Sequence, residues 1–298
     1  MTAVTHEAIE RRNPGSAAAG LFGLLPAACA AAAFVALFAR PVATLARDWW
    51  TLPEAGHGVL LTPIALWLAW RGGVHPRAGR SVWLGAAILV AAVALRTASS
   101  LAAELFTMRL SVVGALLGLT VFYGGVRQAR HWRLPLLLLT LAIPLPQLVT
   151  QGLTLPLQFQ ASELGAYLLE LRGVPVLLTG NVIRIPGHEL FVTEACSGLR
   201  SLAALISVAI LAGAFFLRST LARLGLLIVA VPIAIIVNGA RVFLTGFLVH
   251  FASPAMGTGF MHATEGWLLF LVSLSALAGA AAIAGIAERA VDRRRRHA

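Results

Sequence analysis

The chain has 298 residues, of which 59% are hydrophobic and 12% carry a charge. This composition excludes soluble enzyme folds and disordered scaffolds, because water does not solvate so much apolar surface. The net charge of +11 would also suit a nucleic-acid binder, but in so apolar a chain a membrane explains it better, and we expect no nucleic-acid partner.

Apolar stretches that approach membrane-spanning length recur along the whole chain. A helix needs about 20 apolar residues to cross roughly 30 Å of hydrocarbon. The candidates, in chain order, are Gly20–Ala39, Gly58–Trp70, Trp83–Leu95, Leu105–Gly125, Leu134–Val149, Leu199–Leu217, Leu224–Phe247 and Gly266–Ala287. The sequence therefore predicts an all-α polytopic membrane protein of about eight transmembrane helices. We expect one membrane domain, residues 20–287, between a cytoplasmic tail at 1–19 and a basic cytoplasmic tail at 288–298.

Arginine placement predicts the orientation of these spans. All 23 basic residues are arginine. The two tails and alternate connections hold 15 of them against four acidic residues, a balance of +11 that equals the whole net charge. Because cytoplasmic segments retain basic residues during insertion, we expect both termini on the cytoplasmic side of the cell (inner) membrane. The long connection 150–195 then lies outside.

The first span contains one of the two cysteines, Cys29. The segment Leu25–Cys29 has some likeness to a lipoprotein processing site. However, Pro26 stands where such a site prefers an apolar residue, and removal of the first span would invert the charge alternation downstream. We therefore interpret Cys29 as a small residue in a helix interface.

The connection 150–195 has a pattern of its own. Residues Leu153–Leu171 have the pattern of an amphipathic helix at the membrane interface, with apolar positions at Leu157, Leu164, Leu168 and Leu171. Two β-prone runs within Val176–Ile185 flank Gly180-Asn181, which predicts a hairpin. A second turn at Pro186–Glu189 then directs Leu190–Thr193 back toward the membrane.

Polar residues cluster where the sixth span begins, in the segment Glu194–Ser201. Within it, Cys196 is expected at a helix amino terminus, where free N–H groups and the helix dipole favour the thiolate. The alternative is that Cys196 is merely a small buried residue, which is the usual state of a cysteine in a membrane helix.

Two further residues are expected at the same depth as Cys196. Arg241, in Asn238–Arg241, lies about 17 residues, or roughly 26 Å, along the seventh span from its cytoplasmic end. Charged residues in spans are costly and usually functional, although Arg241 could instead snorkel to lipid headgroups. His262 lies at the outer start of the eighth span, where a histidine beside Trp267 is often an interfacial anchor.

These three blocks together resemble the signature blocks of the exosortase/archaeosortase family of membrane cysteine transpeptidases. The blocks are Glu194–Arg200, Asn238–Arg241, and His262 with Gly266. The likeness extends from about Asp48 to Phe270 and includes Trp49, His57–Pro63, Ile143–Pro146, Gly173–Val176 and Gly180-Asn181. Gly56 differs, because serine is common there in the family.

The resemblance implies a function, which we state as an expectation. Exported proteins would be cleaved at carboxy-terminal sorting signals that combine a Pro-Glu-Pro-like motif, a transmembrane helix and a basic cluster. Cys196 would attack as thiolate and form a thioester, His262 would be the general base and acid, and Arg241 would stabilise the oxyanion. An amine of the cell envelope is a possible acceptor. The active site would face the extracytoplasmic side, and we expect neither a cofactor nor a metal.

Several neighbouring residues have alternative interpretations. Glu194 could orient His262 or Arg241, or simply complement the helix dipole. Arg200 could bind a substrate carboxylate or pair with Glu194. Asn238 could hydrogen-bond across helices, and His250 competes with His262 for the role of base. The alternative function is a membrane transporter, or an assembly factor for surface polysaccharide, without peptide chemistry.

Overall fold

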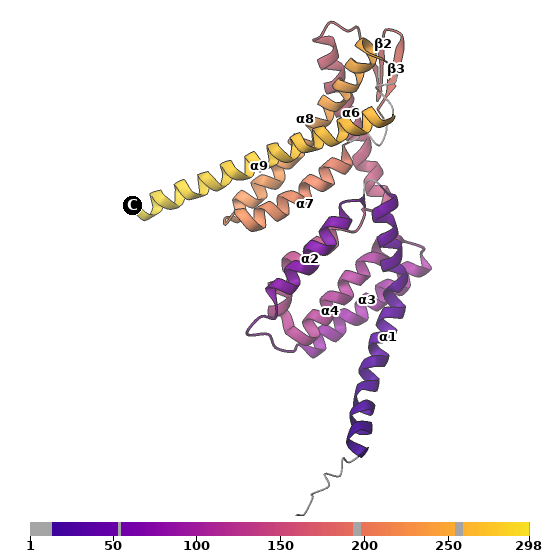
Figure 1. Cartoon of the computed structure of the whole chain (residues 1–298), viewed down its shortest axis with the longest axis vertical. Helices are drawn as coiled ribbons and strands as arrows, with labels where there is room; N and C mark the ends of the chain where they lie inside the picture. Colours follow the sequence, from indigo (N-terminus) through magenta and orange to yellow (C-terminus); the bar gives the residue numbers. More distant parts are fainter. Residues whose placement is uncertain (1–13, 53–54, 193–197, 254–258, 298) are drawn as a thin grey trace, which may run out of the picture.

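A computed structural model describes residues 14–52, 55–192, 198–253 and 259–297 (Figure 1). The described part of the chain is mostly helical, with one small sheet between the sixth and seventh helices. Its helices are α1 (Pro14–Thr51), α2 (Gly58–Gly72), α3 (Val82–Leu101), α4 (Leu105–His131), α5 (Arg133–Leu141), α6 (Gln147–Glu170), α7 (Leu199–Phe216), α8 (Thr220–Phe251) and α9 (Gly259–His297). Its strands are β1 (Leu177–Thr179), β2 (Val182–Ile185) and β3 (His188–Phe191).

Six helices of the described residues are long and apolar enough to cross a membrane, which agrees with a polytopic membrane protein. They are Ala30–Thr51 of α1, all of α3, α4, α7 and α8, and Gly266–Val291 of α9. The helix α2 is apolar but has only 15 residues. The number of spans, eight by sequence, and their orientation therefore stay predictions.

The predicted span Leu134–Val149 is wrong, because the chain does not form one helix there. Helix α5 ends at Leu141, and α6 begins only at Gln147. Pro144 and Pro146 lie between them. Proline lacks the N–H that a continuing helix needs and disfavours helical backbone at the residue before it. This break separates the helices α1–α5 from the helices α6–α9 (Figure 1).

In the first group, small residues let α3 pack closely on α4. A side chain at Gly118 would collide with Leu89, because a Cβ there would lie 2.8 Å from its Cγ. Phe38 of α1 packs with Ala92 and Ala115 of the same pair. Helix α2 packs on α5 through Leu61, Ala65, Leu138 and Ala142. Small interface residues of this kind are how membrane helices gain close contact, since lipid offers no hydrophobic drive between them.

The predicted amphipathic helix is present as α6, but its buried face differs from the prediction. The buried residues are mostly small or polar: Thr154, Gln158, Ala161, Ser162, Gly165, Ala166 and Leu169. This face packs on α8, where a Cβ at Gly165 would lie 2.5 Å from Val242 Cγ1. Leu171, from the predicted apolar stripe, is 62% exposed. Close helix packing therefore decides which face of α6 is buried, rather than apolar character.

The predicted hairpin and second turn are confirmed, and they form an antiparallel sheet of order β1-β2-β3. Gly180 and Gly187 occupy the two turns with positive φ, which glycine adopts without a steric penalty. Ile183 and Ile185 of β2 are buried against Leu169 of α6 and Val249 of α8. The sheet thus lies at one end of the α6–α8 pair (Figure 1).

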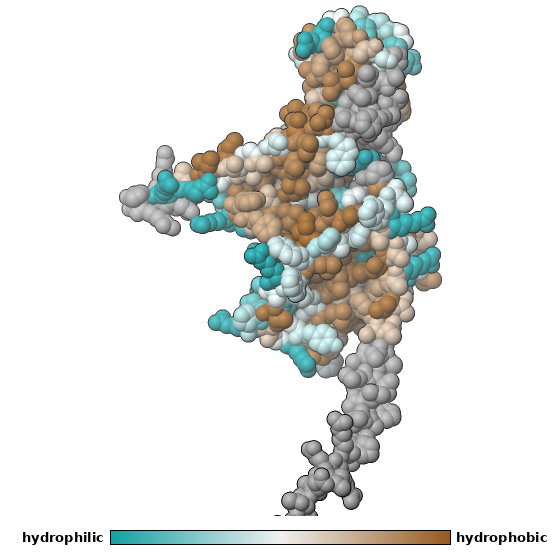
Figure 2. Space-filling view, in the orientation of Figure 1, coloured by the Kyte–Doolittle hydropathy of each residue, from teal (hydrophilic) through white to brown (hydrophobic). Residues whose placement is uncertain are grey.

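Large apolar side chains cover much of the outer surface (Figure 2). Trp83, Leu148 and Ile283 are all at least 70% exposed, on three different elements. A water-soluble chain rarely exposes so much contiguous apolar surface, whereas lipid tails solvate it. The surface therefore agrees with the membrane location that the composition predicts.

Candidate active site

Helix α8 places Asn238 directly against the amino terminus of α7. A Cβ built on Gly198 would lie 2.8 Å from Asn238 Cγ, so the two backbones meet with only the amide side chain between them. Gly198 is the N-cap of α7 and has φ +77°, a left-handed conformation that favours glycine. Asn238 is 7% exposed. Glycine at 198 therefore serves both the turn and the contact with Asn238.

The same helix places Arg241 against α9. A Cβ built on Gly266 would lie 3.2 Å from Arg241 Nη2, so the guanidinium lies over the backbone of α9 at this position. Arg241 is half-buried and lies three residues after Asn238, on the same side of α8. One face of α8 thus contacts both α7 at its start and α9 in its second turn.

Cys196 and Glu194 lie outside the described residues, but the chain on both sides of them is anchored. On one side, Val192 exchanges two hydrogen bonds with Asn181: its N–H donates to the Asn181 carbonyl (2.9 Å), and its carbonyl accepts from Asn181 Nδ2 (3.1 Å). On the other side, Gly198 is held against Asn238. Cys196 is separated from each of these anchored residues by only a few positions in the sequence.

The position of His262 follows from the backbone of α9. The helix begins at Gly259, so residue 262 belongs to its first turn. It precedes Gly266 by four residues, and residues four apart share one helix face. Position 262 is therefore on the face of α9 whose next turn contacts Arg241. The backbone thus brings all three sequence blocks to one region of α8.

The competing candidates lie less centrally. His250 follows Arg241 by nine residues, which corresponds to about 13 Å along α8 and to the opposite face of the helix. Its ring lies 4.7 Å from that of Phe251, edge to face. Arg200 is exposed in the first turn of α7. The backbone of α8 thus places His250 away from the Asn238–Arg241 face.

Trp49 and His57, which belong to the amino-terminal part of the family resemblance, both bind the end of α5. Trp49 Nε1 donates to the Ala142 carbonyl at 2.7 Å, and His57 Nε2 donates to the Leu141 carbonyl at 3.0 Å. The Trp49 ring covers Gly58 so closely that a Cβ there would overlap it. Trp49 and His57 therefore satisfy carbonyl groups that α5 leaves free at its carboxy-terminal end, which is a structural role.

The sequence reasoning missed one strong contact beside this block. Arg109 Nη2 donates to Asp48 Oδ2 at 2.6 Å, and the Arg109 side chain is only 5% exposed. The pair fixes the end of α1, and with it Trp49, to the first turns of α4. The sequence signal for this contact is the pair of opposite charges at the expected outer ends of the first and fourth spans.

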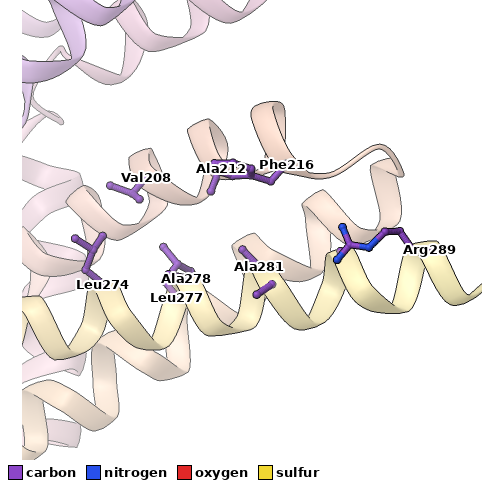
Figure 3. A pocket seen from close by; sticks show the side chains of 10 residues that line it. Val208, Ala212, Phe216, Leu274, Leu277, Ala278, Ala281 and Arg289 are labelled. Carbon is purple, nitrogen blue, oxygen red and sulfur yellow. The ribbon is translucent and has the colours of Figure 1, made fainter.

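A separate groove runs between α7 and α9 (Figure 3). It has a volume of about 460 Å³, and its walls are apolar except for one guanidinium. Its lining is Val208, Ala212, Phe216, Leu274, Leu277, Ala278, Ala281, Ala282, Gly285 and Arg289. The groove contains none of the residues of the three blocks. Among the described residues, no three His, Cys, Asp or Glu side chains gather in a way that would hold a metal ion.

Comparison with known families gives one result. A family model described as transmembrane exosortase matches residues 49–279, which is more than half of the chain. The match includes the block around Trp49 and all three blocks that α8 brings together. Comparisons with curated proteins and with solved structures find no match.

Proposed function

Because the chain belongs to the transmembrane exosortase family, we propose that it is a membrane-embedded cysteine peptidase or transpeptidase. Its substrates are exported proteins with a carboxy-terminal sorting signal, made of a Pro-Glu-Pro-like motif, a transmembrane helix and a basic cluster. The observation that carries this proposal is the position of α8. It contacts a glycine of each of the other two blocks, with Asn238 at Gly198 and Arg241 at Gly266.

The first step of the proposed reaction forms an acyl-enzyme. His262 takes the proton of the Cys196 thiol, and the thiolate attacks the carbonyl carbon of the scissile peptide bond. The carbon–nitrogen bond then breaks, and His262 gives the proton to the leaving amine. The carboxy-terminal fragment departs with its transmembrane helix, and the exported protein remains bound to Cys196 as a thioester.

The second step releases the exported protein. An amine of the cell envelope, or water, attacks the thioester carbonyl, and the carbon–sulfur bond breaks. Cys196 leaves as thiolate, and His262 accepts the proton of the attacking group. With an amine the result is transfer to a new partner, and with water it is hydrolysis.

Arg241 is proposed to stabilise the negative charge that develops on the carbonyl oxygen in both steps. Its half-buried guanidinium lies against the backbone of α9. Preorganised donors become more effective where burial reduces screening by water. Asn238 and Asn181 position the chain on either side of Cys196, and they act through that segment rather than on the substrate.

The location of the reaction is also part of the proposal. The arginine alternation favours the outer face of the inner membrane for Cys196 and an inward-facing carboxy-terminal tail. A substrate anchored in the same bilayer would then present its cleavage motif at the outer surface, just beyond its own transmembrane helix. This geometry suits an enzyme whose nucleophile lies where a span begins.

The test is cleavage of a reporter that ends in such a sorting signal, with purified full-length protein in nanodiscs. We expect Cys196→Ala to abolish release of the tail while leaving the protein folded. Cys29→Ala is the matched control and should cleave at nearly the wild-type rate. Cleavage retained by Cys196→Ala would contradict a cysteine mechanism, whereas no cleavage by the wild type would favour a transporter or assembly factor.

A further inference from the structure

A second cluster of cationic groups lies away from the three blocks. It joins His75 and Arg77, from the connection between α2 and α3, to Arg127, Arg130 and His131 near the end of α4. These five residues line a surface pocket of about 400 Å³. Two segments about 50 residues apart in the sequence therefore contribute to one cationic site.

The pocket has a fixed frame. Gln128, which is 3% exposed, accepts from the His75 backbone N–H at 2.7 Å and donates from Nε2 to the Gly73 carbonyl at 3.2 Å. Trp132 Nε1 also donates to the Gly73 carbonyl, at 3.1 Å. These bonds attach the connection to α4, so the cationic side chains are held near one another before any ligand arrives.

The histidine rings have defined hydrogen-bonding states. His131 Nε2 lies 2.9 Å from the Gly72 carbonyl and must donate to it, because a carbonyl only accepts. His75 Nδ1 accepts from the Arg77 backbone N–H at 3.1 Å, which leaves Nε2 as a donor in the neutral ring. The two rings meet edge to face, with centroids 5.6 Å apart. The pocket thus combines a further donor with three guanidinium groups.

No negative charge balances this site within the described residues. Its lining contains no Asp or Glu. The described ion pairs are Arg109–Asp48 and Arg184–Glu189, and neither involves an arginine of the pocket. The positive-inside rule accounts for arginines in this connection, but it does not require them to converge with two histidines on a braced pocket. Like charges that lie close together repel one another, and an anion bound among them removes this repulsion.

We propose that this pocket binds a phosphate group, and that the group belongs to the headgroup of an anionic phospholipid of the cytoplasmic leaflet. Arginine forks match phosphate oxygens well, and basic pockets at the cytoplasmic ends of helices suit such headgroups. Exposed apolar side chains, as acyl chains require, precede the pocket residue His75 closely in the sequence: Trp70 is 81% exposed and Val74 75%. A free phosphate ion shares the chemistry but would gain nothing from these neighbours.

The test uses full-length protein in nanodiscs of phosphatidylcholine that contain a small fraction of a photoactivatable phosphatidylglycerol. The variant is Arg77→Gln with Arg130→Gln, because neither side chain has a hydrogen bond to another described residue, so the fold should persist. The control, Arg80→Gln with Arg218→Gln, removes the same charge from the same expected side of the membrane but outside the pocket. We expect the crosslinking yield to fall tenfold or more in the pocket variant and to change little in the control.

A second arm separates the two sources of phosphate. Crosslinking is repeated with inorganic phosphate added at constant ionic strength. If phosphate does not compete, the lipid headgroup is supported as the ligand. If phosphate competes fully with the lipid, the phosphate site stands but the lipid assignment is overturned. Equal loss in the pocket and control variants, or no loss in either, overturns the site, since general membrane charge then explains binding. Should the double variant not fold, Arg130→Gln alone is compared with Arg80→Gln.

Discussion

Arg241 is the residue whose proposed role can be separated most sharply from a structural one. A guanidinium offers a planar set of donors, whereas lysine offers a point charge on a differently shaped stem. If Arg241 stabilises the oxyanion, Arg241→Lys should slow the chemical step by about 10²–10³, the loss typical of removing one oxyanion donor. The measurement is single-turnover cleavage with excess enzyme in nanodiscs. A Lys variant with a near wild-type rate would leave Arg241 as a snorkelling or packing residue.

At this scale, the sequence gives candidate residues more readily than it predicts how they meet. The rise of a helix predicts that Arg241 lies near the outer end of its span. In the structure, Arg241 lies beside Gly266, and Gly266 follows His262 by four residues. The contacts between Gly198 and Asn238 and between Asp48 and Arg109 were not predicted, because each depends on how one helix is rotated against another. Sequence periodicity fixes the rotation of a helix only when one face is clearly apolar, and lipid-facing helices lack that signal. The roles of Cys196, Glu194 and His262 stay predictions, since the described structure does not include those side chains.

Among the elements, α4 has an amino-terminal cap that the sequence analysis did not identify. Glu104 accepts from the Phe106 N–H at 2.9 Å and from the Thr107 N–H at 2.7 Å, and the Thr107 hydroxyl donates to the same carboxylate. The Thr107 hydroxyl is the main cause that holds the pKa of Glu104 below its ordinary value of 4.5. Burial is the next largest influence and opposes it, and the two backbone N–H groups act in the same direction as the hydroxyl. Glutamate is not among the preferred N-cap residues, so its pattern gave no signal.

The cap predicts a pH-dependent contribution to stability. The pKa of Glu104 is lower in the folded protein, so its contribution is present above about pH 4.5 and is lost as the pH falls through the folded pKa. Glu104→Ala should therefore lower the free energy of unfolding by about 1 kcal/mol at pH 7, and this difference should shrink below about pH 4. Thermal unfolding in detergent at both pH values measures it. Glu163→Ala, at an exposed site on α6, is the control, and an equal effect in both variants would contradict the cap.

The elements that were predicted well depend on local signals. The hairpin follows from Gly180-Asn181, whose conformation the neighbouring residues alone determine. The two errors arose where local and long-range preferences compete. The apolar residues around Pro144 and Pro146 favour a span, but the two prolines lack the N–H groups that a continuous helix needs. In α6 the leucine stripe looked like the buried face, but small residues allow the closer approach to α8.

For the whole molecule, the membrane orientation is the prediction with the widest consequences. A thiol reagent that cannot cross membranes should label a cysteine at Thr179 in β1 from outside spheroplasts. A cysteine at Arg130, on α4, should react only after permeabilisation. Both are exposed positions, and each is placed in a chain without native cysteines. The reverse pattern would contradict the orientation and place the α7 amino terminus on the cytoplasmic side.

The arrangement of the helix groups could not be derived from the sequence. Composition and charge give the class of protein and an orientation, but the break between α5 and α6 decides which helices become neighbours (Figure 1). The packing of α6 on α8, and not on α5, then places the sheet against the carboxy-terminal end of α8, where Val249 lies. Such long-range pairing is a property of the folded chain, and no single segment encodes it.

The length of α9 gives the molecule a mechanical property. Its 39 residues correspond to an unbroken rod of about 58 Å, which exceeds a bilayer of about 40–45 Å with its headgroups. Position 262 lies at one end of this lever and the terminal arginines at the other. A tilt of roughly 10° at one end would swing the other end by about 10 Å. A spin label or fluorophore on the basic tail would thus register movements at position 262, without any probe near that position.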